Sequence, residues 1–496
     1  MDKKEVFIIG AGLGGLSTAI SLRAKGYKVT IYEKNYNSGG KMNVYKDKGF
    51  LFDIGPHIIT LPQIIDDLFL SINKNPKDYF ELIEIKPFNR YITKDSIFDI
   101  SSNADENYKL VEKLFPCDIR NYSRLEKLSK NYYRLTNSQF QKYKKTNITE
   151  FYKLFQLFLY SPFESLSNKL NKILKTASLR DIYYSFCFYI GTDPKHTCSI
   201  YLMLDYLQKE FGVFYVKGGM YKLSQGLEKL ARELGVKILF DSEVSNLKLE
   251  ENKISSINVK HGIDQKIINL KNSILVSNMD FGFTHTLIED YQKLSSVNRE
   301  INQYYSLPQS TSAFIILLGL DNKIKELKHH NTFLSDDIIN EFSEIYEKKQ
   351  LSTDPTIGID ITTKSDDTVA PPGCDSLFIM ASPSSSLKIA WNDIKNDYAN
   401  QIIKKIETRL KINIHDHIIV KKIITPTDIT EMYNQPYGSI YGQSAWGVKG
   451  LVSRKTNKSK FITNLYFAGG SVQPGGGIPM VISSGLTVSY LIDKNA

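Results

Sequence analysis

Residues 6–33 read VFIIGAGLGGLSTAISLRAKGYKVTIYE and carry the clearest structural signal in the chain. It opens with four apolar residues that show no polar alternation, as expected for a strand buried on both faces. The pattern G-x-G-x-x-G follows at once over residues 10–15, and apolar residues at helical spacing then lead to Gly26, a helix stop. A second strand ends at Glu33. The stretch therefore predicts a strand–turn–helix–strand unit.

The glycine turn has the features of a dinucleotide-binding site. In such a turn Gly10 permits the tight bend, Gly12 lets the backbone approach a pyrophosphate, and Gly15 lets helix and strand pack closely. The first helical turn, with Leu13 and Gly14, offers free N–H groups and the positive end of the helix dipole. Glu33, at the end of the second strand, occupies the position at which a carboxylate accepts hydrogen bonds from ribose hydroxyls. A glycine-rich turn without a ligand is the alternative, but this register favours binding of an ADP moiety.

Length and composition narrow the class of protein. A chain of 496 residues exceeds a single core, so we expect two domains. The net charge of +10 is a mild excess, the basic runs 142–145 and 455–460 are short, and no basic helix carries interleaved aromatics suited to bases. Nucleic acid is therefore a poor partner, and an anionic membrane surface is a better one. Four cysteines without C-x-x-C spacing fit a reduced cytoplasmic interior and exclude a disulfide or zinc framework.

Two uncharged segments could be mistaken for membrane spans. Residues 6–22 contain the glycine turn, which fits a nucleotide site better than a signal peptide. Residues 461–492 are long enough to cross a bilayer, but they hold six glycines and two prolines, which a lipid-exposed helix accommodates poorly. We interpret both as buried cofactor-binding segments and predict no span and no export signal.

Further basic residues and glycines follow the strand–turn–helix–strand unit of residues 6–33. Lys34 follows the acidic residue directly, and a glycine pair then ends in Gly40-Lys41. A glycine pair followed by a cation suits a loop around a pyrophosphate–ribityl chain. The next predicted strand ends in the turn Gly55-Pro56.

The fingerprint, the Gly-Gly-Lys and the Phe-Asp-x-Gly-Pro together resemble the flavin amine oxidase and phytoene desaturase superfamily. In that superfamily the basic residue after the glycine pair contacts the phosphate–ribityl region of the flavin. NAD dehydrogenases lack this continuation. The resemblance therefore implies FAD as the cofactor, and it implies no metal.

Later segments follow the same resemblance. Residues 211–234 are similar to the G-V-x-x-x-x-G-G-x-x-x-L segment of the desaturases, and Val244 occupies the position whose backbone meets the adenine. Asn278 lies in a V-S-N motif at a strand end that faces the flavin in that superfamily. His329-His330-Asn331 and Asp354-Pro355 match two further family segments. A paired histidine suggests a metal, but the resemblance does not support one.

Residues 464–479 are the segment most specific to the bacterial phytoene desaturases. The resemblance implies a close backbone approach to the flavin and a helix whose N-terminus points at its pyrimidine; the residues implied are Gly469, Gly470, Gly477, Ile478 and Pro479. Val472 and Gln473 depart from the threonine and histidine of many desaturases. This variant is associated with branches acting on desaturated or oxygenated carotenoids, including terminal oxygenases.

The resemblance covers almost the whole chain and implies an α/β fold with a discontinuous Rossmann-type FAD-binding domain. That domain comprises residues 1–75, 205–297 and 435–496. An inserted α+β substrate domain comprises residues 76–204 and 298–434. It would carry a helical part that faces the membrane.

The expected function is FAD-dependent desaturation of a C30 or C40 carotene of the phytoene or diapophytoene type. Three alternatives stay open: a carotenoid terminal-methyl oxygenase, a flavin amine oxidase, and a non-catalytic carotenoid carrier. No catalytic residue is evident in the sequence. The substrate is lipophilic, so we expect a cytoplasmic protein attached peripherally to the membrane.

Residues 151–175 are the candidate membrane contact. They begin with an aromatic and apolar run and continue with a stripe at helical spacing flanked by lysines; the stripe consists of Leu166, Leu170, Ile173 and Leu174. An apolar face with flanking lysines and aromatics suits a helix lying in a headgroup layer. A helix packed on its own domain is the alternative.

Overall fold

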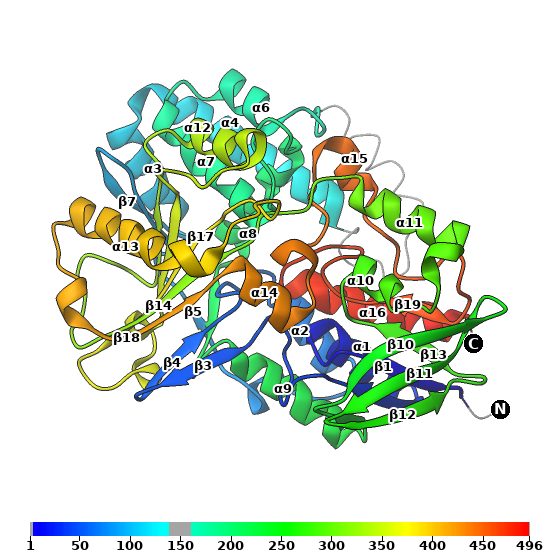
Figure 1. Ribbon diagram of the computed structural model, residues 1–496. Coiled ribbons are helices and arrows are strands. Elements are labelled where there is room, and N and C mark those ends of the chain that lie inside the picture. The colour runs from blue at the N-terminus through cyan, green and yellow to red at the C-terminus, as the bar shows by residue number, and fades with distance from the viewer. Residues whose placement is uncertain (1–2, 138–159, 496) are drawn as a thin grey trace.

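The computed structural model describes residues 3–137 and 160–495. A five-stranded parallel sheet gathers strands from distant parts of the chain in the order β19–β13–β1–β2–β9 (Figure 1). Its strands are short and apolar because both faces of the sheet are covered. Their bounds are β1 (Glu5–Ile9), β2 (Lys28–Tyr32), β9 (Lys237–Leu239), β13 (Ile274–Ser277) and β19 (Leu465–Phe467).

Alternate residues of β1 face two different layers. Val6 and Ile8 pack among helices on one face, whereas Phe7 and Ile9 pack beneath a three-stranded antiparallel sheet on the other. The helices of the first face are α1 (Leu13–Ala24), α2 (Gln63–Leu70), α9 (Tyr221–Glu233) and α16 (Ile478–Lys494). The elements of the second face are β10 (Glu243–Glu250), β11 (Lys253–His261), β12 (Asp264–Asn269), α10 (Phe281–Thr286) and α11 (Ser295–Tyr305).

A second, seven-stranded sheet has the order β18–β14–β17–β16–β15–β6–β7, and only its β15–β6 pair is parallel. One face of this sheet packs against α13 (Trp391–Leu410). The other face packs against Phe50 and Phe52, which lie on a two-stranded hairpin. The strands are β6 (Asn89–Ile92), β7 (Ile97–Ile100), β14 (Phe314–Leu320), β15 (His330–Phe333), β16 (Ile357–Ile361), β17 (Asp375–Ala381) and β18 (Ile418–Ile424). The hairpin is β3 (Val44–Asp47) and β4 (Phe50–Asp53).

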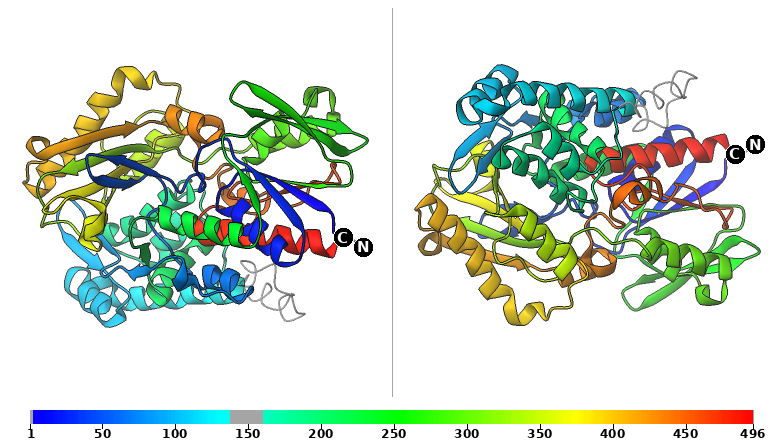
Figure 2. Two further views of the ribbon diagram at one scale, coloured as in Figure 1. Left: turned by 90° about the horizontal axis from the view of Figure 1, so that it is seen from below. Right: turned by 90° about the horizontal axis from the view of Figure 1, so that it is seen from above.

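A helical layer completes the molecule around its own aromatic core. Figure 2 shows this layer and the β10–β12 sheet on opposite sides of the molecule in both views. Its helices are α3 (Ala104–Leu114), α4 (Ile119–Thr136), α6 (Leu166–Ile173), α7 (Ala177–Ile190), α8 (Met203–Phe211) and α12 (Ile338–Ser343). The remaining elements are β5 (Leu82–Glu84), β8 (Phe214–Val216), α14 (Pro426–Tyr433) and α15 (Gly447–Val452).

The α/β class predicted from the sequence is confirmed, but the leucine stripe does not face outward. Leu166, Leu170 and Leu174 are at most 1% exposed and belong to the core of the helical layer. Lys169 forms an ion pair with Glu164 at 3.0 Å. The expectation that this stripe contacts lipid is therefore wrong, because the stripe packs on α4 and α7 instead.

The aromatic run of the same candidate membrane contact comprises residues 151–160, and all of it except residue 160 lies outside the described residues. Among the residues that are described, no helix is both long and apolar enough to cross a membrane.

Candidate active site

The glycine turn joins β1 to α1 at the carboxyl edge of the parallel sheet, where ligands of such sheets bind. Gly10 has φ +94°, a conformation that favours glycine. A Cβ on Gly15 would lie 2.1 Å from the Gly10 carbonyl oxygen, so only glycine allows helix and strand to approach this closely. Gly12 is the N-cap of α1, and Leu13 and Gly14 form its first turn.

The side chain of Asn278 fills the space beside these glycines. A Cβ on Gly12 would lie 2.6 Å from its Nδ2, and Cβ atoms on Gly14 and Gly469 would lie 2.5 and 2.9 Å from its Oδ1. The backbone N–H of Asn278 donates to the Ile9 carbonyl at 2.8 Å, which fixes the residue at the strand end. Its amide has no hydrogen-bond partner among the described residues. The amide is thus free to contact a ligand, and it also imposes glycine on its neighbours.

Glu33 is buried against the turn. Its Oε2 accepts from the backbone N–H of Ala11 at 2.7 Å, and its Oε1 accepts from the backbone and side chain of Asn35 at 3.0 and 2.9 Å. Burial raises the pKa of Glu33, against these hydrogen bonds. Each carboxylate oxygen has two acceptor sites, so capacity for a ribose hydroxyl remains. The N–H of Ser242 donates to the Glu33 carbonyl, which brings the buried Val244 to the same edge.

The glycine pair before Lys41 lies against the turn. The N–H of Gly39 donates to the Ala11 carbonyl at 2.9 Å, and a Cβ on Gly40 would lie 3.4 Å from the Gly12 Cα. A Cβ on Gly55 would lie 1.9 Å from the Lys41 carbonyl oxygen, so the second glycine loop packs on the first. The adjacent Pro56 is exposed.

The two basic residues of this region have protein partners. Lys41 donates from Nζ to the Gln435 side chain at 2.9 Å and to the Ile440 carbonyl at 2.7 Å. Burial lowers the pKa of Lys41 to about 8, although Asp280 opposes this shift. Lys34 donates to the end of α14, at the Glu431 carbonyl and the Asn434 side chain. Lys41 therefore lies inside the site, whereas Lys34 ties the loop to α14.

Small residues before α16 leave an open space at the helix N-terminus. Gly477 has φ +101°, and a Cβ there would meet nothing within 4 Å. A Cβ on Gly470 would lie 3.4 Å from the Gly476 Cα, so this loop folds closely on itself. Ile478 and Pro479 form the first turn of α16. The glycine cradle, the free Asn278 amide and this open helix N-terminus fit FAD, which the protein binds as its cofactor.

Sequence reasoning missed Asp280, which links several parts of the site. Its Oδ1 accepts from the N–H groups of Gly282 and Phe283 and so caps α10. Its Oδ2 accepts from the Tyr304 hydroxyl at 2.8 Å and from the Gln435 side chain at 3.1 Å. An aspartate two residues after the V-S-N motif, at a helix start, was the available signal.

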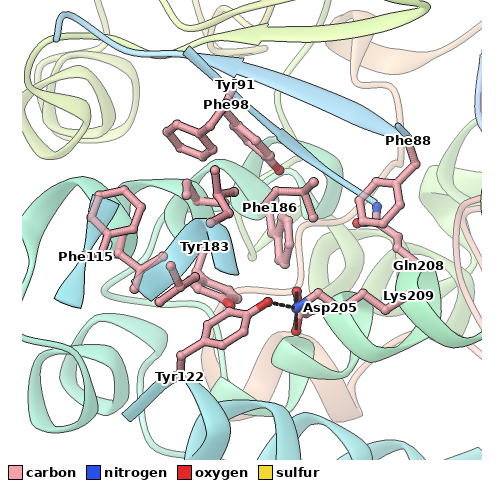
Figure 3. Close-up of a pocket in the computed structure, with 15 residues that line it drawn as sticks. Phe88, Tyr91, Phe98, Phe115, Tyr122, Tyr183, Phe186, Asp205, Gln208 and Lys209 are labelled. Atoms are coloured by element: carbon pink, nitrogen blue, oxygen red, sulfur yellow. Dashed lines mark hydrogen bonds and ion pairs between the residues drawn. The ribbon is translucent and has the colours of Figure 1, made fainter. Parts of the chain in front are cut away.

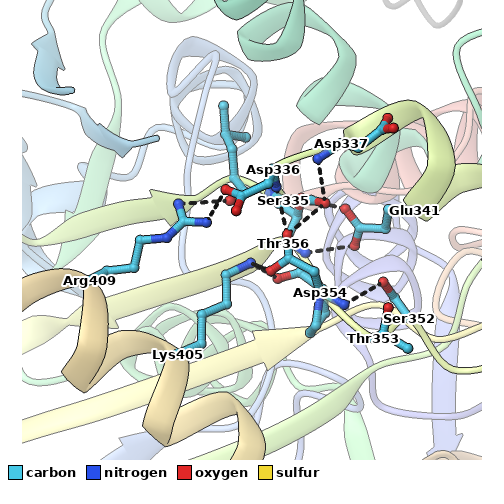
Figure 4. Close-up of polar contacts among 12 residues, drawn as sticks. Ser335, Asp336, Asp337, Glu341, Ser352, Thr353, Asp354, Thr356, Lys405 and Arg409 are labelled. Atoms are coloured by element: carbon cyan, nitrogen blue, oxygen red, sulfur yellow. Dashed lines mark hydrogen bonds and ion pairs between the residues drawn. The ribbon is translucent and has the colours of Figure 1, made fainter. Parts of the chain in front are cut away.

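The two family segments with His329 and Asp354 have a structural role. Asp354 accepts from the Ser335 hydroxyl and the Asp336 N–H, and Lys405 pairs with it from α13 (Figure 4). Glu341 accepts from both the N–H and the hydroxyl of Thr356 (Figure 4). These contacts join α12 and α13 across the edge of the second sheet.

A separate small cavity lies within the helical layer. It is lined mainly by aromatic rings, and Lys209 lies at one end (Figure 3). Lys209 donates to the Tyr122 hydroxyl at 2.8 Å and to Asp205 at 2.9 Å, and it pairs with Glu126 at 3.2 Å. These polar groups satisfy one another, as buried charges require. The described residues contain no group of three or more His, Cys, Asp or Glu side chains that could hold a metal.

Comparison with known proteins gives three results. A family profile described as flavin containing amine oxidoreductase matches residues 13–327. A 4,4'-diapolycopene oxygenase of Methylomonas sp is 33% identical over 98% of this chain and 97% of its own length. A 4,4'-diaponeurosporene oxygenase of Staphylococcus haemolyticus (strain JCSC1435) is 31% identical over 99% of this chain and 98% of its own.

Among solved structures, the fold is similar to that of an oxidoreductase from Methanosarcina mazei. The TM-score is 0.64 at 16% identity, covering 98% of this chain and 99% of the other. A putrescine oxidase bound to putrescine gives a TM-score of 0.62 at 14% identity, covering 99% of each chain. At these identities the likeness concerns the fold alone.

Proposed function

The chain belongs to the family of flavin-containing amine oxidoreductases, and from this premise we propose that it is an FAD-dependent oxygenase of linear carotenoids. The proposed reaction is oxidation of the terminal methyl carbon of a C30 carotenoid. One observation carries the proposal: relatives that match nearly the entire chain at 33% and 31% identity are named as oxygenases of 4,4'-diapolycopene and 4,4'-diaponeurosporene.

These relatives favour the oxygenase over the desaturase that the sequence motifs predicted first. Val472 and Gln473, where the chain departs from many desaturases, support the same choice. A desaturase acting on CH–CH bonds is the second candidate, because it uses the same scaffold. The two candidates share the cofactor and the lipophilic substrate and differ in whether oxygen enters the product.

The strands of the two sheets support a division of the chain into a flavin half and a substrate half. Every strand of the parallel sheet falls in residues 1–75, 205–297 or 435–496, and every strand of the seven-stranded sheet falls in 76–204 or 298–434. We assign FAD to the first set and the carotenoid to the second. The substrate would then lie between the carboxyl edge of the parallel sheet and the facing side of the second sheet.

When bound, FAD supplies the redox chemistry, and the chain supplies binding, orientation and exclusion of water. Glu33 would accept from the ribose, and the Asn278 amide would contact the cofactor between Gly12 and Gly469. Lys41 places a positive charge inside the site, where a phosphate or a reduced ring would carry negative charge.

Because carotenoids are insoluble in water, we also propose peripheral attachment to the cytoplasmic surface of the membrane. The net charge of +10 supports binding to anionic lipid. Holoprotein should sediment with anionic vesicles and less with neutral ones, and salt should weaken the binding. Equal sedimentation with both kinds of vesicle would contradict an electrostatic contribution.

Product analysis tests the proposed reaction. Holoprotein is supplied with 4,4'-diapolycopene and 4,4'-diaponeurosporene in vesicles, and the pigments are analysed by mass. Gain of oxygen at an end carbon supports the oxygenase. Loss of two hydrogens without oxygen supports the desaturase. Unchanged pigment from fully FAD-loaded protein would contradict both and favour a carrier.

A further inference from the structure

Lys41 keeps part of its hydrogen-bonding capacity unused. Its ammonium group carries three N–H donors. Two of them donate to the Gln435 side chain and to the Ile440 carbonyl, and the third has no acceptor among residues 3–137 and 160–495. Both acceptors are neutral, whereas a charge removed from water is costly unless it is paired. Lys41 therefore has one donor and a positive charge available for an anionic ligand.

The Gln435 side chain connects Lys41 to Asp280. Its Oε1 accepts from Lys41 Nζ at 2.9 Å, while its Nε2 donates to Asp280 Oδ2 at 3.1 Å and to Ser439 Oγ at 3.2 Å. An ammonium can only donate and a carboxylate can only accept, so a single orientation of the amide satisfies both neighbours. Gln435 is buried, so water does not replace these contacts. Asp280 thus determines that the amide oxygen, and not the amide nitrogen, faces Lys41.

Asp280 is itself held firmly at the start of α10. Its Oδ1 accepts from two backbone N–H groups of that helix, and its Oδ2 also accepts from the Tyr304 hydroxyl at 2.8 Å. A Cβ on Gly442 would lie 2.7 Å from the Tyr304 hydroxyl oxygen and 3.2 Å from Asp280 Oδ2, so the backbone of this loop packs directly on the pair. The carboxylate cannot turn away from Gln435 without breaking these contacts.

The charge of Asp280 favours the protonated form of Lys41. Burial lowers the pKa of Lys41 to about 8, and Asp280 opposes this shift, so removing the charge of Asp280 would lower the pKa further. Burial raises the pKa values of Tyr304 and Tyr305, which therefore stay neutral near pH 8. Arg454, whose charge also acts on Tyr304, stays protonated in this range. Asp280 is thus the charge that sets the ionisation of Lys41.

We propose that Asp280 and Gln435 are positioning residues that hold the Lys41 ammonium charged and in place to bind the pyrophosphate of FAD. The carboxylate fixes the amide, the amide holds the ammonium, and the remaining N–H of the ammonium donates to the cofactor. Lys41 follows Gly40, which packs on Gly12 of the glycine turn, so a pyrophosphate at that turn is within its reach. The inference rests on the FAD site alone and holds for an oxygenase and a desaturase alike.

The test titrates full-length apoprotein with FAD over a range of pH. Wild-type affinity should fall as the pH rises above about 8, where Lys41 loses its charge. Asp280→Asn removes the charge but keeps an oxygen that can cap α10, and the fall should begin roughly one pH unit lower. Gln435→Met breaks the link at nearly unchanged side-chain length. It should weaken FAD binding roughly tenfold at pH 7, as expected for one hydrogen bond to a charged group.

Tyr304→Phe is the matched control, because it removes a hydrogen bond to the same oxygen of Asp280 and keeps the charge. The fall in affinity should begin at the wild-type pH. A shift in Tyr304→Phe as large as in Asp280→Asn would overturn the proposal, since loss of packing would then explain both. An unchanged onset in Asp280→Asn would also overturn it. If Asp280→Asn does not fold, Gln435→Met decides alone, and unchanged affinity at pH 7 would contradict the proposal.

ADP identifies the part of the cofactor that Lys41 binds, because it has the pyrophosphate without the flavin ring. Its affinity should show the same fall above about pH 8 and the same loss in Gln435→Met. ADP binding that depends on neither would overturn the assignment to the pyrophosphate.

These measurements use no carotenoid, which separates the inference from the proposed reaction. A protein that shows the expected shifts but adds no oxygen to any carotenoid would support the role of Asp280 and contradict the proposed function. A protein that oxygenates carotenoids but shows no shift in Asp280→Asn would support the function and overturn the role of Asp280.

Discussion

Replacing Glu341 with glutamine should stabilise the protein in a strongly pH-dependent way. Glu341 is 2% exposed, and its two oxygens accept from the N–H and the hydroxyl of Thr356, each at 2.6 Å. Burial nevertheless dominates and raises the pKa of Glu341 from 4.5 to about 8. A carboxyl with a raised pKa contributes its full stability below pH 4.5 and loses it as the pH rises toward 8.

The size of the effect follows from these two pKa values. Compared with a residue that stays neutral, Glu341 lowers the free energy of unfolding by about 1 kcal/mol at pH 5 and by about 4 kcal/mol at pH 7.5. Glutamine stays neutral and can keep both contacts, since its amide oxygen accepts from the Thr356 N–H and its amide nitrogen donates to the Thr356 hydroxyl oxygen. The advantage of Glu341→Gln should thus grow by about 3 kcal/mol between the two pH values.

Urea unfolding of the FAD-loaded protein at both pH values measures this difference in the free energy of unfolding. Glu347→Gln is the control, because Glu347 lies in the next turn with a side chain that is 55% exposed. It should show no comparable pH dependence. An advantage of Glu341→Gln that is equal at pH 5 and pH 7.5 would contradict this prediction, since it would mean that Glu341 ionises normally in the folded protein.

Three further predictions concern the cofactor site. Gly12→Ala should release FAD, because its Cβ would lie 2.6 Å from Asn278 Nδ2. Adding Asn278→Ala should restore part of the FAD loading, which is measured from the flavin absorbance of the purified protein. No recovery would mean that the cofactor itself needs the space beside Gly12. Glu33→Ala should weaken FAD binding by roughly 1.5–3 kcal/mol per lost ribose hydrogen bond and should leave the Ala11 N–H without its acceptor. If titration of the apoprotein with FAD gives an unchanged affinity, Glu33 does not face the ribose. FAD affinity should fall as the pH rises through about 8, where Lys41 loses its charge, and this slope should disappear in Lys41→Met; a slope of equal size in the variant would exclude Lys41 as its cause.

The nucleotide-binding half of the fold was predictable because its signals are local. The strand, the glycine turn and the helix at residues 6–24 all lie within one short stretch, and each has its own propensity. The role of Asn278 was only partly predictable: its motif placed it at a strand end, but its contacts with Gly12 and Gly14 join residues more than 260 positions apart. No periodicity within either segment carries that information.

For the leucine stripe, by contrast, the sequence signal predicted the wrong environment. A leucine stripe flanked by lysines looks the same whether it lies in lipid or packs on a neighbouring helix, because helical periodicity reports an apolar face and not its partner. In the structure, Leu166 and Leu170 pack against neighbouring helices of the helical layer. The contacts of His57 and His330 with Asp360 were likewise hidden, since they depend on the second sheet lying against the flavin half.

The contacts between α1 and α16 have a consequence for how the protein acquires its cofactor. Gly485 lets the two helices touch, with its Cβ position only 2.1 Å from Ser17 Oγ, and β19 closes the parallel sheet beside β13. The glycine turn is synthesised before these supports, which follow more than 450 residues later in the chain. Such long-range closure slows folding. During synthesis the apolar face of α1 therefore stays uncovered until α16 has been made, so FAD meets a complete site only late in synthesis.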